Sequence, residues 1–263
     1  MRIALLIPAG GAASHDRNAE AQLATNFAQI PPGFIVSRVW SSDPDSSIVD
    51  DGVDLYIPGI EGYFEILRKS LAAIRYVSEK HNPDFIIRGN SSNYFQFAAI
   101  FDLLEPLNPS LDFYGGSIGE ISADITPLNL ALKYVGGSGI YLSRKTYLRL
   151  MKMDSELYEN VVDDVAIGHF LRDAGVRFTP VSRNDVTDYE PVQFAPQSRI
   201  KCHSSDALTV KRFEAVAKVL NTPGRLKRNL LQLLFVGTEI QFLAQQLNFR
   251  AILRLFRKFR FIS

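Results

Sequence analysis

The chain has 263 residues, enough for one large domain or two small ones, and 46% of them are hydrophobic and 22% charged. These proportions are those of a globular protein and exclude a disordered or fibrous chain. A single cysteine, Cys202, excludes an intrachain disulfide and a cysteine-rich zinc site. The net charge of +1 conceals an asymmetry: residues 225–263 carry eight basic residues and one acid, a net +7, whereas residues 1–224 carry −6.

The first predicted element is a buried strand over Arg2–Ile7. Its apolar run is shorter than the core of a signal peptide, so we expect no targeting segment. The strand leads into a glycine-containing loop, in which Pro8, Ala9 and Gly10 are candidate contacts for a phosphate or a base. The loop matches neither G-x-G-x-x-G nor the P-loop pattern, so a plain turn remains the alternative.

Further along the chain, strand patterns alternate with helical ones. Strands are predicted at Arg2–Ile7, Phe34–Val39, Leu55–Ile57, Phe85–Arg88, Gly139–Leu142 and Arg177–Val181. Helices are predicted from apolar stripes over Ile60–Ile74 and Phe95–Leu104, from the cap residue Ser143 to about Met151, from Asp163 or Asp164 to Gly175, and after Asp206. This alternation predicts an α/β fold with a largely parallel sheet flanked by helices.

A cluster of small polar residues, Asn90, Ser91, Ser92 and Asn93, follows the apolar strand that ends at Arg88. Ligands of open α/β sheets bind at the carboxyl ends of strands, so this cluster is a candidate binding site. The structural alternative is that Ser92 or Asn93 caps the next helix, which accounts for only part of the cluster.

Two further segments carry candidate chemistry. Gly136, Gly137 and Ser138 precede a strand and allow a ligand to approach the backbone closely, and Asp163 and Asp164 stand at a predicted helix start. Capping uses one carboxylate, so the other is free to act as a general base. Lys201 and His203 lie in a polar stretch that can reach such a site.

The segment Gly136–Arg144 (GGSGIYLSR), followed by Asp163–Gly168 (DDVAIG), resembles the Fringe-like and β-1,3-galactosyl- and N-acetylglucosaminyltransferases. The resemblance covers roughly residues 60–181. It implies a GT-A fold, a nucleotide-sugar donor, with a UDP-sugar expected first, and inversion at the anomeric carbon. It also implies that Asp164 is the catalytic base and that Asp163 caps or orients.

The same resemblance implies positions for the two substrates. Gly136, Gly137 and Ser138 would line the acceptor and donor-sugar side, with Lys201 and His203 beside them. The residues themselves, rather than the resemblance, give the expected donor contacts, which are Pro8, Ala9, Gly10, Lys69, Arg88, Asn90, Ser91 and Ser92. In the Fringe group a histidine downstream of the acid pair helps to hold the metal, and His203 is a loose positional candidate for that histidine.

One departure from the family pattern bears on the metal. The family carries D-x-D where this chain has Asn90-Ser91-Ser92, which offers no carboxylate to Mg²⁺ or Mn²⁺. We therefore expect a metal-independent enzyme and assign no metal ligand, although Mn²⁺ dependence is the outcome that would overturn this. Positive charge for the leaving diphosphate would then have to come from other groups, for which the candidates are Arg88, Lys69, Arg68, Lys201 and backbone amides.

The turn sequence Asn221–Gly224 divides a predicted catalytic domain, residues 1–224, from a basic helical extension, residues 225–263. Within the extension, apolar and basic residues fall on opposite helical faces, which is typical of an interfacial helix on an anionic membrane. The alternative is a helix packed on the domain with its basic face in solvent. Nucleic acid is not expected, because the rest of the chain is acidic.

The sequence therefore predicts a cytoplasmic glycosyltransferase, peripheral at the inner face of the membrane, acting on a glycan or lipid-linked acceptor in surface polysaccharide assembly. Three alternatives stay open. They are a catalytically inactive nucleotide-sugar-binding protein, a metal-dependent nucleotidyltransferase, and a membrane-associated interaction protein without a small-molecule site.

Overall fold

The computed structural model describes residues 1–10, 13–28, 30–123, 128, 130–186, 195–200 and 213–218, with the side chains of 13–16 and 184–186 left aside. The α-helices are α1 (Ala13–Thr25), α2 (Ile66–His81), α3 (Phe97–Leu104), α4 (Arg144–Leu150) and α5 (Asp163–Asp173). The main sheet contains β1 (Ile3–Pro8), β2 (Phe34–Ser42), β3 (Val49–Asp50), β4 (Asp54–Pro58), β5 (Phe85–Gly89), β7 (Tyr114–Gly116), β10 (Gly139–Ser143) and β11 (Phe178–Pro180). Smaller sheets contain β6 (Asn93–Phe95), β12 (Arg183–Val186) and β13 (Gln197–Ile200), and β8 (Ile118–Ile121) with β9 (Leu132–Val135).

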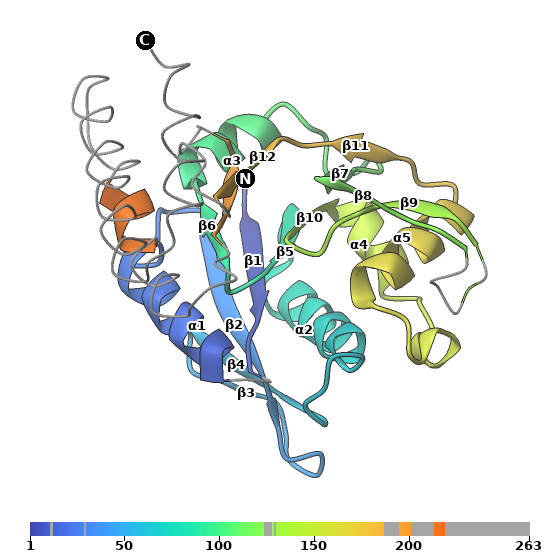
Figure 1. Ribbon diagram of the computed structural model, residues 1–263, viewed down its shortest axis with the longest axis horizontal. Coiled ribbons are helices and arrows are strands. Elements are labelled where there is room, and N and C mark those ends of the chain that lie inside the picture. The colour runs from blue at the N-terminus through green and yellow to red at the C-terminus, as the bar shows by residue number, and fades with distance from the viewer. Residues whose placement is uncertain are drawn as a thin grey trace, which may run out of the picture.

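The main sheet has eight strands in the order β11-β7-β10-β5-β1-β2-β4-β3. Its centre is parallel, because β1 pairs in parallel with both β2 and β5, and β2 pairs in parallel with β4. Beyond β5 the direction reverses, since β10 runs antiparallel to both β5 and β7. The predicted fold class, a mixed and mostly parallel sheet flanked by helices, is confirmed for the described residues (Figure 1).

Helices cover both faces of this sheet. In Figure 1, α1 lies to the left of the central strands, α3 lies above them, and α2, α4 and α5 lie to the right. The side chains of β1 alternate accordingly, with Ala4 and Leu6 in one apolar cluster and Ile3, Leu5 and Ile7 in the other. This period of two, with both faces apolar, is what a strand buried between two helical layers requires.

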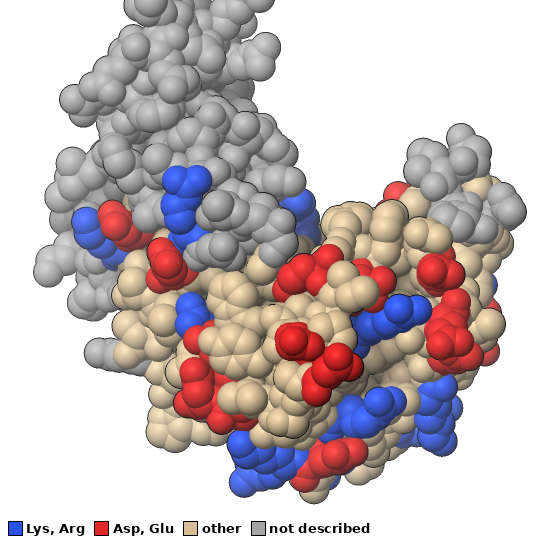
Figure 2. Space-filling model, turned by 90° about the horizontal axis from the view of Figure 1, so that it is seen from below, with Lys and Arg blue, Asp and Glu red and all other residues tan. Residues whose placement is uncertain are grey.

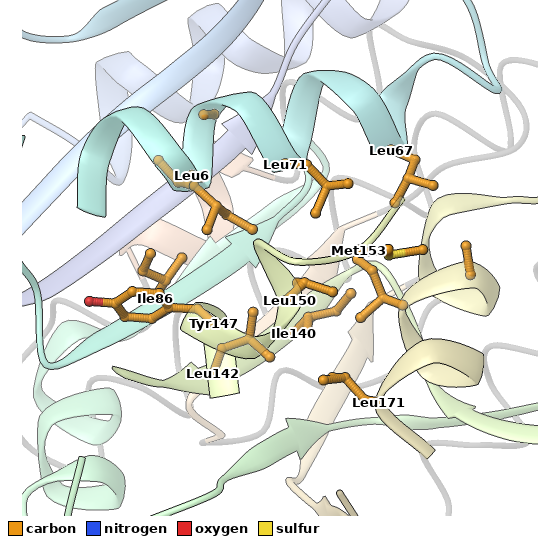
Figure 3. Packing of buried hydrophobic residues seen from close by; sticks show 14 of the residues in the cluster. Leu6, Leu67, Leu71, Ile86, Ile140, Leu142, Tyr147, Leu150, Met153 and Leu171 are labelled. Carbon is orange, nitrogen blue, oxygen red and sulfur yellow. The ribbon is translucent and has the colours of Figure 1, made fainter. Parts of the chain in front are cut away.

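The larger cluster lies between the sheet and α2, α4 and α5 (Figure 3). Leu67 and Leu71 of α2 face Leu150 and Leu171 across this layer, and each of the four is at most 6% exposed. These contacts anchor α2 and α5 to the same body, so the loops that precede the two helices hold fixed positions at one edge of the sheet.

All six predicted strands are present, and Ser143 caps α4 as predicted, because its side chain accepts a hydrogen bond from the Thr146 N–H. The predicted start of α2 is wrong. The helix begins at Ile66, and Ile60 and Phe64, at 71% and 46% exposed, lie in the loop before it. Apolar residues of a loop happened to continue the helical spacing of the stripe.

The predicted cap of α5 is also wrong, as is the alternative interpretation in which Ser92 or Asn93 caps the next helix. Val162 occupies the N-cap position of α5 and offers no side-chain acceptor, so Asp163 and Asp164 are the first two residues of the helix itself. Asn93 belongs to β6, and Gln96 precedes α3 without capping it through its side chain. Capping therefore does not account for the polar cluster after β5.

Several predictions fall outside the described residues. These are Lys201, His203, the start of the helix after Asp206, the boundary at residue 224 and the extension 225–263. Residues 213–218 are described and helical. Among the described helices, none combines the length and the apolar character that crossing a bilayer demands.

Candidate active site

The sequence-predicted site residues meet at one edge of the main sheet. The parallel strands β1 and β5 end there with Gly10 and Asn90 just beyond, and β10 begins there because Gly139 pairs with Gly89 in antiparallel register. Gly137, in the loop before β10, contacts Asp164 at the start of α5. Three loops and a helix start thus converge at the carboxyl ends of the parallel strands, where open α/β sheets bind ligands.

A buried ion pair joins β5 to α5. The Arg88 guanidinium lies 2.7 Å from Asp163 Oδ2, and the two side chains are only 3% and 6% exposed. Arg88 also donates hydrogen bonds to Asn90 Oδ1, at 2.9 Å, and to the Gly137 carbonyl oxygen. Arg88 is therefore paired with Asp163 in this structure. The predicted contact between Arg88 and a diphosphate stays a prediction.

Asp164 is held differently from its neighbour. Its Oδ2 accepts a 2.7 Å hydrogen bond from the Gly137 N–H, and its Oδ1 accepts one from the Val165 N–H. Burial and, second, the charge of Asp163 raise the pKa of Asp164, and the Gly137 hydrogen bond and Arg88 oppose this. The pair is thus differentiated: one carboxylate is neutralised by arginine, and the other has increased proton affinity, as a general base requires.

The absence of a side chain at Gly137 allows Arg88 and Asp164 to approach the backbone of this loop. A Cβ at this position would stand 2.8 Å from Arg88 Nη1 and 3.2 Å from Asp164 Oδ2. Only glycine leaves room for both side chains against the loop, which gives a structural reason for one glycine of the GGSG sequence.

A second pair fixes the loop after β1. Lys69 donates to the Ala9 carbonyl oxygen at 2.8 Å and to Glu61 Oε1 at 2.9 Å, and Glu61 also accepts a hydrogen bond from the Ser41 N–H. Gly10, with φ of +91°, lies directly under the Glu61 carboxylate. Lys69 is 6% exposed and is committed to these partners, so its predicted contact with the donor stays a prediction.

The polar cluster after β5 is tied to α1 and β13. Gln22 of α1 donates to the carbonyl oxygens of Asn90 and Asn93, and the Ser92 carbonyl oxygen accepts from the Ile200 N–H. Ser91 is buried, and Asn90 and Ser92 are half-buried. These hydrogen bonds hold the backbone of the cluster in place beside the carboxyl end of β5.

Two of the remaining predicted residues, Gly136 and Ser138, belong to the loop before β10. Gly136 is half-buried, and Ser138 is buried and accepts a hydrogen bond from Arg183. The side chain of Gln197 from β13 packs against Gly139, the residue after Ser138. A Cβ added to Gly139 would lie 2.2 Å from the amide nitrogen of Gln197. The sequence did not single out Gln22 or Gln197, because only the pairing of distant segments brings them here.

Two tyrosines near Asp164 were also missed. Burial and, second, the charge of Asp164 raise the pKa of Tyr134, and burial followed by the charges of Asp164 and Asp163 raises that of Tyr63. Tyr63 is in the loop before α2, within the stripe that the sequence assigned to that helix. No sequence signal separates such an aromatic residue from a core residue.

The described residues do not fit a catalytic divalent cation. Among them, no three His, Cys, Asp or Glu side chains gather as a metal site would require. Asn90-Ser91-Ser92 offers no carboxylate, and Asp163 is already paired with Arg88. On the face drawn in Figure 2, acidic and basic side chains of the described residues alternate in small groups.

Comparison with known proteins gives a likeness in fold. No protein-family description matches the sequence, and no curated protein matches it. A glycosyltransferase involved in the glycosylation of the major capsid of PBCV-1 is similar in structure, with a TM-score of 0.51 and 11% identity over 81% of this chain and 99% of that one. The chain therefore has a GT-A-like fold, as predicted.

Two further solved structures show weaker likeness. The galactosyltransferase LgtC, in complex with donor and acceptor sugar analogues, has a TM-score of 0.47 and 13% identity over 87% of this chain and 99% of that one. A197 from STIV has a TM-score of 0.38 and 10% identity over 69% and 82%.

Proposed function

We propose that this protein is an inverting glycosyltransferase that moves a sugar from a nucleotide sugar, a UDP-sugar foremost, to a hydroxyl group of a glycan or lipid-linked acceptor. The observation that carries the proposal is Asp164: a carboxylate with a raised pKa, fixed by the Gly137 N–H, at the ligand-binding edge of a GT-A-like sheet. The resemblance of the GGSG and DDVAIG segments to the Fringe-like group supports the same reading.

In the proposed reaction, Asp164 takes the proton of the acceptor hydroxyl. The acceptor oxygen forms a bond to the anomeric carbon, and the bond from that carbon to the phosphate oxygen breaks with its electron pair. The nucleotide leaves as a diphosphate when the donor is a UDP-sugar. Because attack and departure occur on opposite faces, the configuration at the anomeric carbon inverts.

The other residues of the site position the reactants. Asp163 does not receive the proton in this scheme, because Arg88 holds its charge and ties α5 to β5. The loop of Pro8, Ala9 and Gly10 and the polar cluster of Asn90, Ser91 and Ser92 would contact the donor. Gly136, Gly137 and Ser138 would lie on the acceptor and donor-sugar side.

Backbone N–H groups in these glycine-containing loops would supply part of the stabilisation of the leaving nucleotide. Since the described residues do not fit a divalent cation, no step is assigned to one. Turnover that appears only with added Mn²⁺ would contradict this part of the proposal.

The test is substitution of the base. Asp164→Asn should abolish sugar transfer and keep donor binding, because the proton acceptor is lost while its size and the hydrogen bond from Gly137 remain. Asp173→Asn is the matched control, because this aspartate lies at the other end of α5 with its side chain 54% exposed.

The assay measures nucleotide release from UDP-, GDP-, dTDP- and CMP-sugars, with binding followed separately by saturation-transfer NMR. Retained turnover in Asp164→Asn would move the base elsewhere. A wild-type protein that binds a donor and never turns it over would instead be the inactive nucleotide-sugar binder, which the missing D-x-D motif favours as the second candidate.

We further propose that residues 225–263 attach the protein to an anionic membrane surface at the inner face of the membrane, where a lipid-linked acceptor for surface polysaccharide assembly would lie. Each basic residue near such a surface contributes about 1 kcal/mol. Replacing Arg250, Arg254, Arg257 and Lys258 by glutamine in the full-length chain should reduce binding to phosphatidylserine vesicles. Unchanged vesicle binding would refute this assignment.

A further inference from the structure

The loop between β4 and α2, residues 59–65, presents an aromatic pair at the rim of the site. Tyr63 is 63% exposed and Phe64 46% exposed, and their rings meet edge to face with centroids 5.4 Å apart. The loop is not free to move away from the site, because Glu61 is held by both Lys69 and the Ser41 N–H. An anchored loop thus keeps a large aromatic face in solvent.

A second tyrosine, Tyr134, packs against the helix that carries Asp164. Tyr134 of β9 stands opposite Gly119 of β8, where an added Cβ would lie 2.9 Å from Tyr134 Cζ. An added Cβ on Gly168 of α5 would lie 2.6 Å from the Tyr134 Cβ. Two glycines therefore form the slot that seats this half-buried ring.

Both tyrosines are close to the candidate base. Asp164 lies one helical turn before Gly168, so it shares with Gly168 the side of α5 that meets Tyr134. Helices α2 and α5 pack against each other, and Leu67 in the first turn of α2 and Val165 in the first turn of α5 are buried in the same apolar layer, so the loop that carries Tyr63 lies on the side of α2 nearer the start of α5. The electrostatic influence of Asp164 on both phenol groups, and of Tyr63 on Tyr134, agrees with this placement.

The chemistry of the three side chains selects the occupant. Aromatic faces bind the apolar C–H face of a ring, whereas a carboxylate and phenol hydroxyls bind hydroxyl groups. A pyranose ring combines these two surfaces, because its C–H groups can lie on the aromatic ring while its hydroxyl groups point to the rim. A purely apolar ligand would offer no hydroxyl proton to Asp164, and neither would a nucleobase.

We propose that Tyr63 and Tyr134 form the acceptor subsite and bind the acceptor as a pyranose ring, which sets one of its hydroxyl groups against Asp164. This inference rests on the proposed function and deepens it: the acceptor is recognised through a sugar ring, including when that sugar is attached to a lipid.

The test uses saturation-transfer NMR on the full-length protein with added UDP. The probes are the methyl glycosides of galactose, glucose, mannose and N-acetylglucosamine. We expect at least one glycoside to bind wild-type protein, with the strongest transfer at its ring C–H protons. Tyr63→Ala should weaken that binding by about three- to tenfold, the effect of losing one aromatic contact.

Two matched variants separate stacking from other effects. Tyr63→Phe keeps the aromatic face and loses only the phenol hydroxyl, so it should bind the glycoside more tightly than Tyr63→Ala does. Phe101→Ala removes another solvent-exposed aromatic side chain, 38% exposed against 63% for Tyr63, from α3 on the other side of the sheet and should leave binding unchanged. Circular dichroism confirms that each variant is folded.

Equal glycoside binding by Tyr63→Ala and wild type would overturn the subsite. So would a loss of UDP binding in Tyr63→Ala with glycoside binding intact, because the ring would then serve the nucleobase. Absence of glycoside binding to wild type would also overturn it. None of these results bears on the base, which the Asp164→Asn turnover assay tests separately.

Discussion

Removing the arginine of the buried ion pair should destabilise the fold more than removing the whole pair. In Arg88→Met, the carboxylate of Asp163 stays buried at 6% exposure without its cation, 2.7 Å from where the guanidinium was. Breaking a buried pair from one side costs about 3–5 kcal/mol of the free energy of unfolding. Asn90 Oδ1 and the Gly137 carbonyl oxygen lose their hydrogen-bond donor as well. The cost of these two lost hydrogen bonds is included in the same range.

The double variant Arg88→Met/Asp163→Leu is the control. It removes both charges and fills the space with apolar atoms, a replacement that is often neutral or stabilising. We expect the double variant to be more stable than Arg88→Met, with a coupling energy of about 2–3 kcal/mol between the two positions. Unfolding in urea, followed by circular dichroism and analysed by linear extrapolation, measures each corner of the cycle.

The pH gives an independent check on the same pair. In Arg88→Met the stranded carboxylate favours its protonated form, so the folded state binds more protons than the unfolded state as the pH falls. The cost of the substitution should therefore be smaller at pH 5 than at pH 8. A cost below about 1 kcal/mol at both pH values, or additive effects of the two substitutions, would refute the view that the ion pair is buried and coupled.

Three further predictions concern the same framework. Burial raises the pKa of Asp164 above its unfolded value, so the ionised carboxylate opposes folding at neutral pH. Asp164→Asn should therefore raise the urea midpoint of unfolding at pH 8 by more than at pH 4. A midpoint at pH 8 equal to or lower than that of the wild type contradicts this. Gly116→Ala should lower the free energy of unfolding by about 2 kcal/mol or more in the same measurement. The reason is that the φ angle of Gly116 is +153° and a Cβ there would lie 2.3 Å from the Gly139 carbonyl oxygen. A loss of stability below about 0.5 kcal/mol would be inconsistent with that contact. Tyr147→Phe should lose about 1 kcal/mol, since its buried hydroxyl donates to the Pro83 carbonyl oxygen at 2.8 Å, and thermal unfolding that matches wild type would show that bond to be absent.

The strands were predictable because local pattern decides them. Ile3–Ile7 and Phe85–Ile87 are continuous apolar runs bounded by polar or turn residues, and such runs suit strands covered on both faces. The cap at Ser143 was predictable for the same reason, since a serine accepts a hydrogen bond from an N–H three residues along whatever the rest of the fold does.

The start of α2 and the caps of α5 and α3 were not predictable, because they depend on contacts distant in sequence. Glu61 is drawn to Lys69 and to the Ser41 N–H, which keeps residues 59–65 out of the helix despite their apolar spacing. Asp163 is drawn to Arg88, and Asp164 to the Gly137 N–H, instead of capping α5.

The candidate site followed the same division. The convergence of Gly10 and Asn90 could be expected, because β1 and β5 are parallel and end at the same edge of the sheet. Gly137 precedes β10 and reaches this edge only because β10 runs antiparallel to β5, which the predicted, largely parallel sheet did not include. The partners of the site residues could not be expected either, because Arg88 reads equally well as a phosphate ligand or as half of an ion pair until α5 is placed beside it. Tyr63 and Tyr134 carry no local signal of function.

Nucleotide-sugar binding at this edge of the sheet tests the central claim most directly. Selective ¹⁵N-glycine labelling gives signals from 17 residues, which include Gly10, Gly89 and Gly137. We predict that one class among UDP-, GDP-, dTDP- and CMP-sugars, added with EDTA, shifts the signals of these three glycines and leaves that of the distant, exposed Gly175 unchanged. Shifts confined to other glycines, or none with any donor, would contradict the assignment of this edge as a glycosyltransferase site.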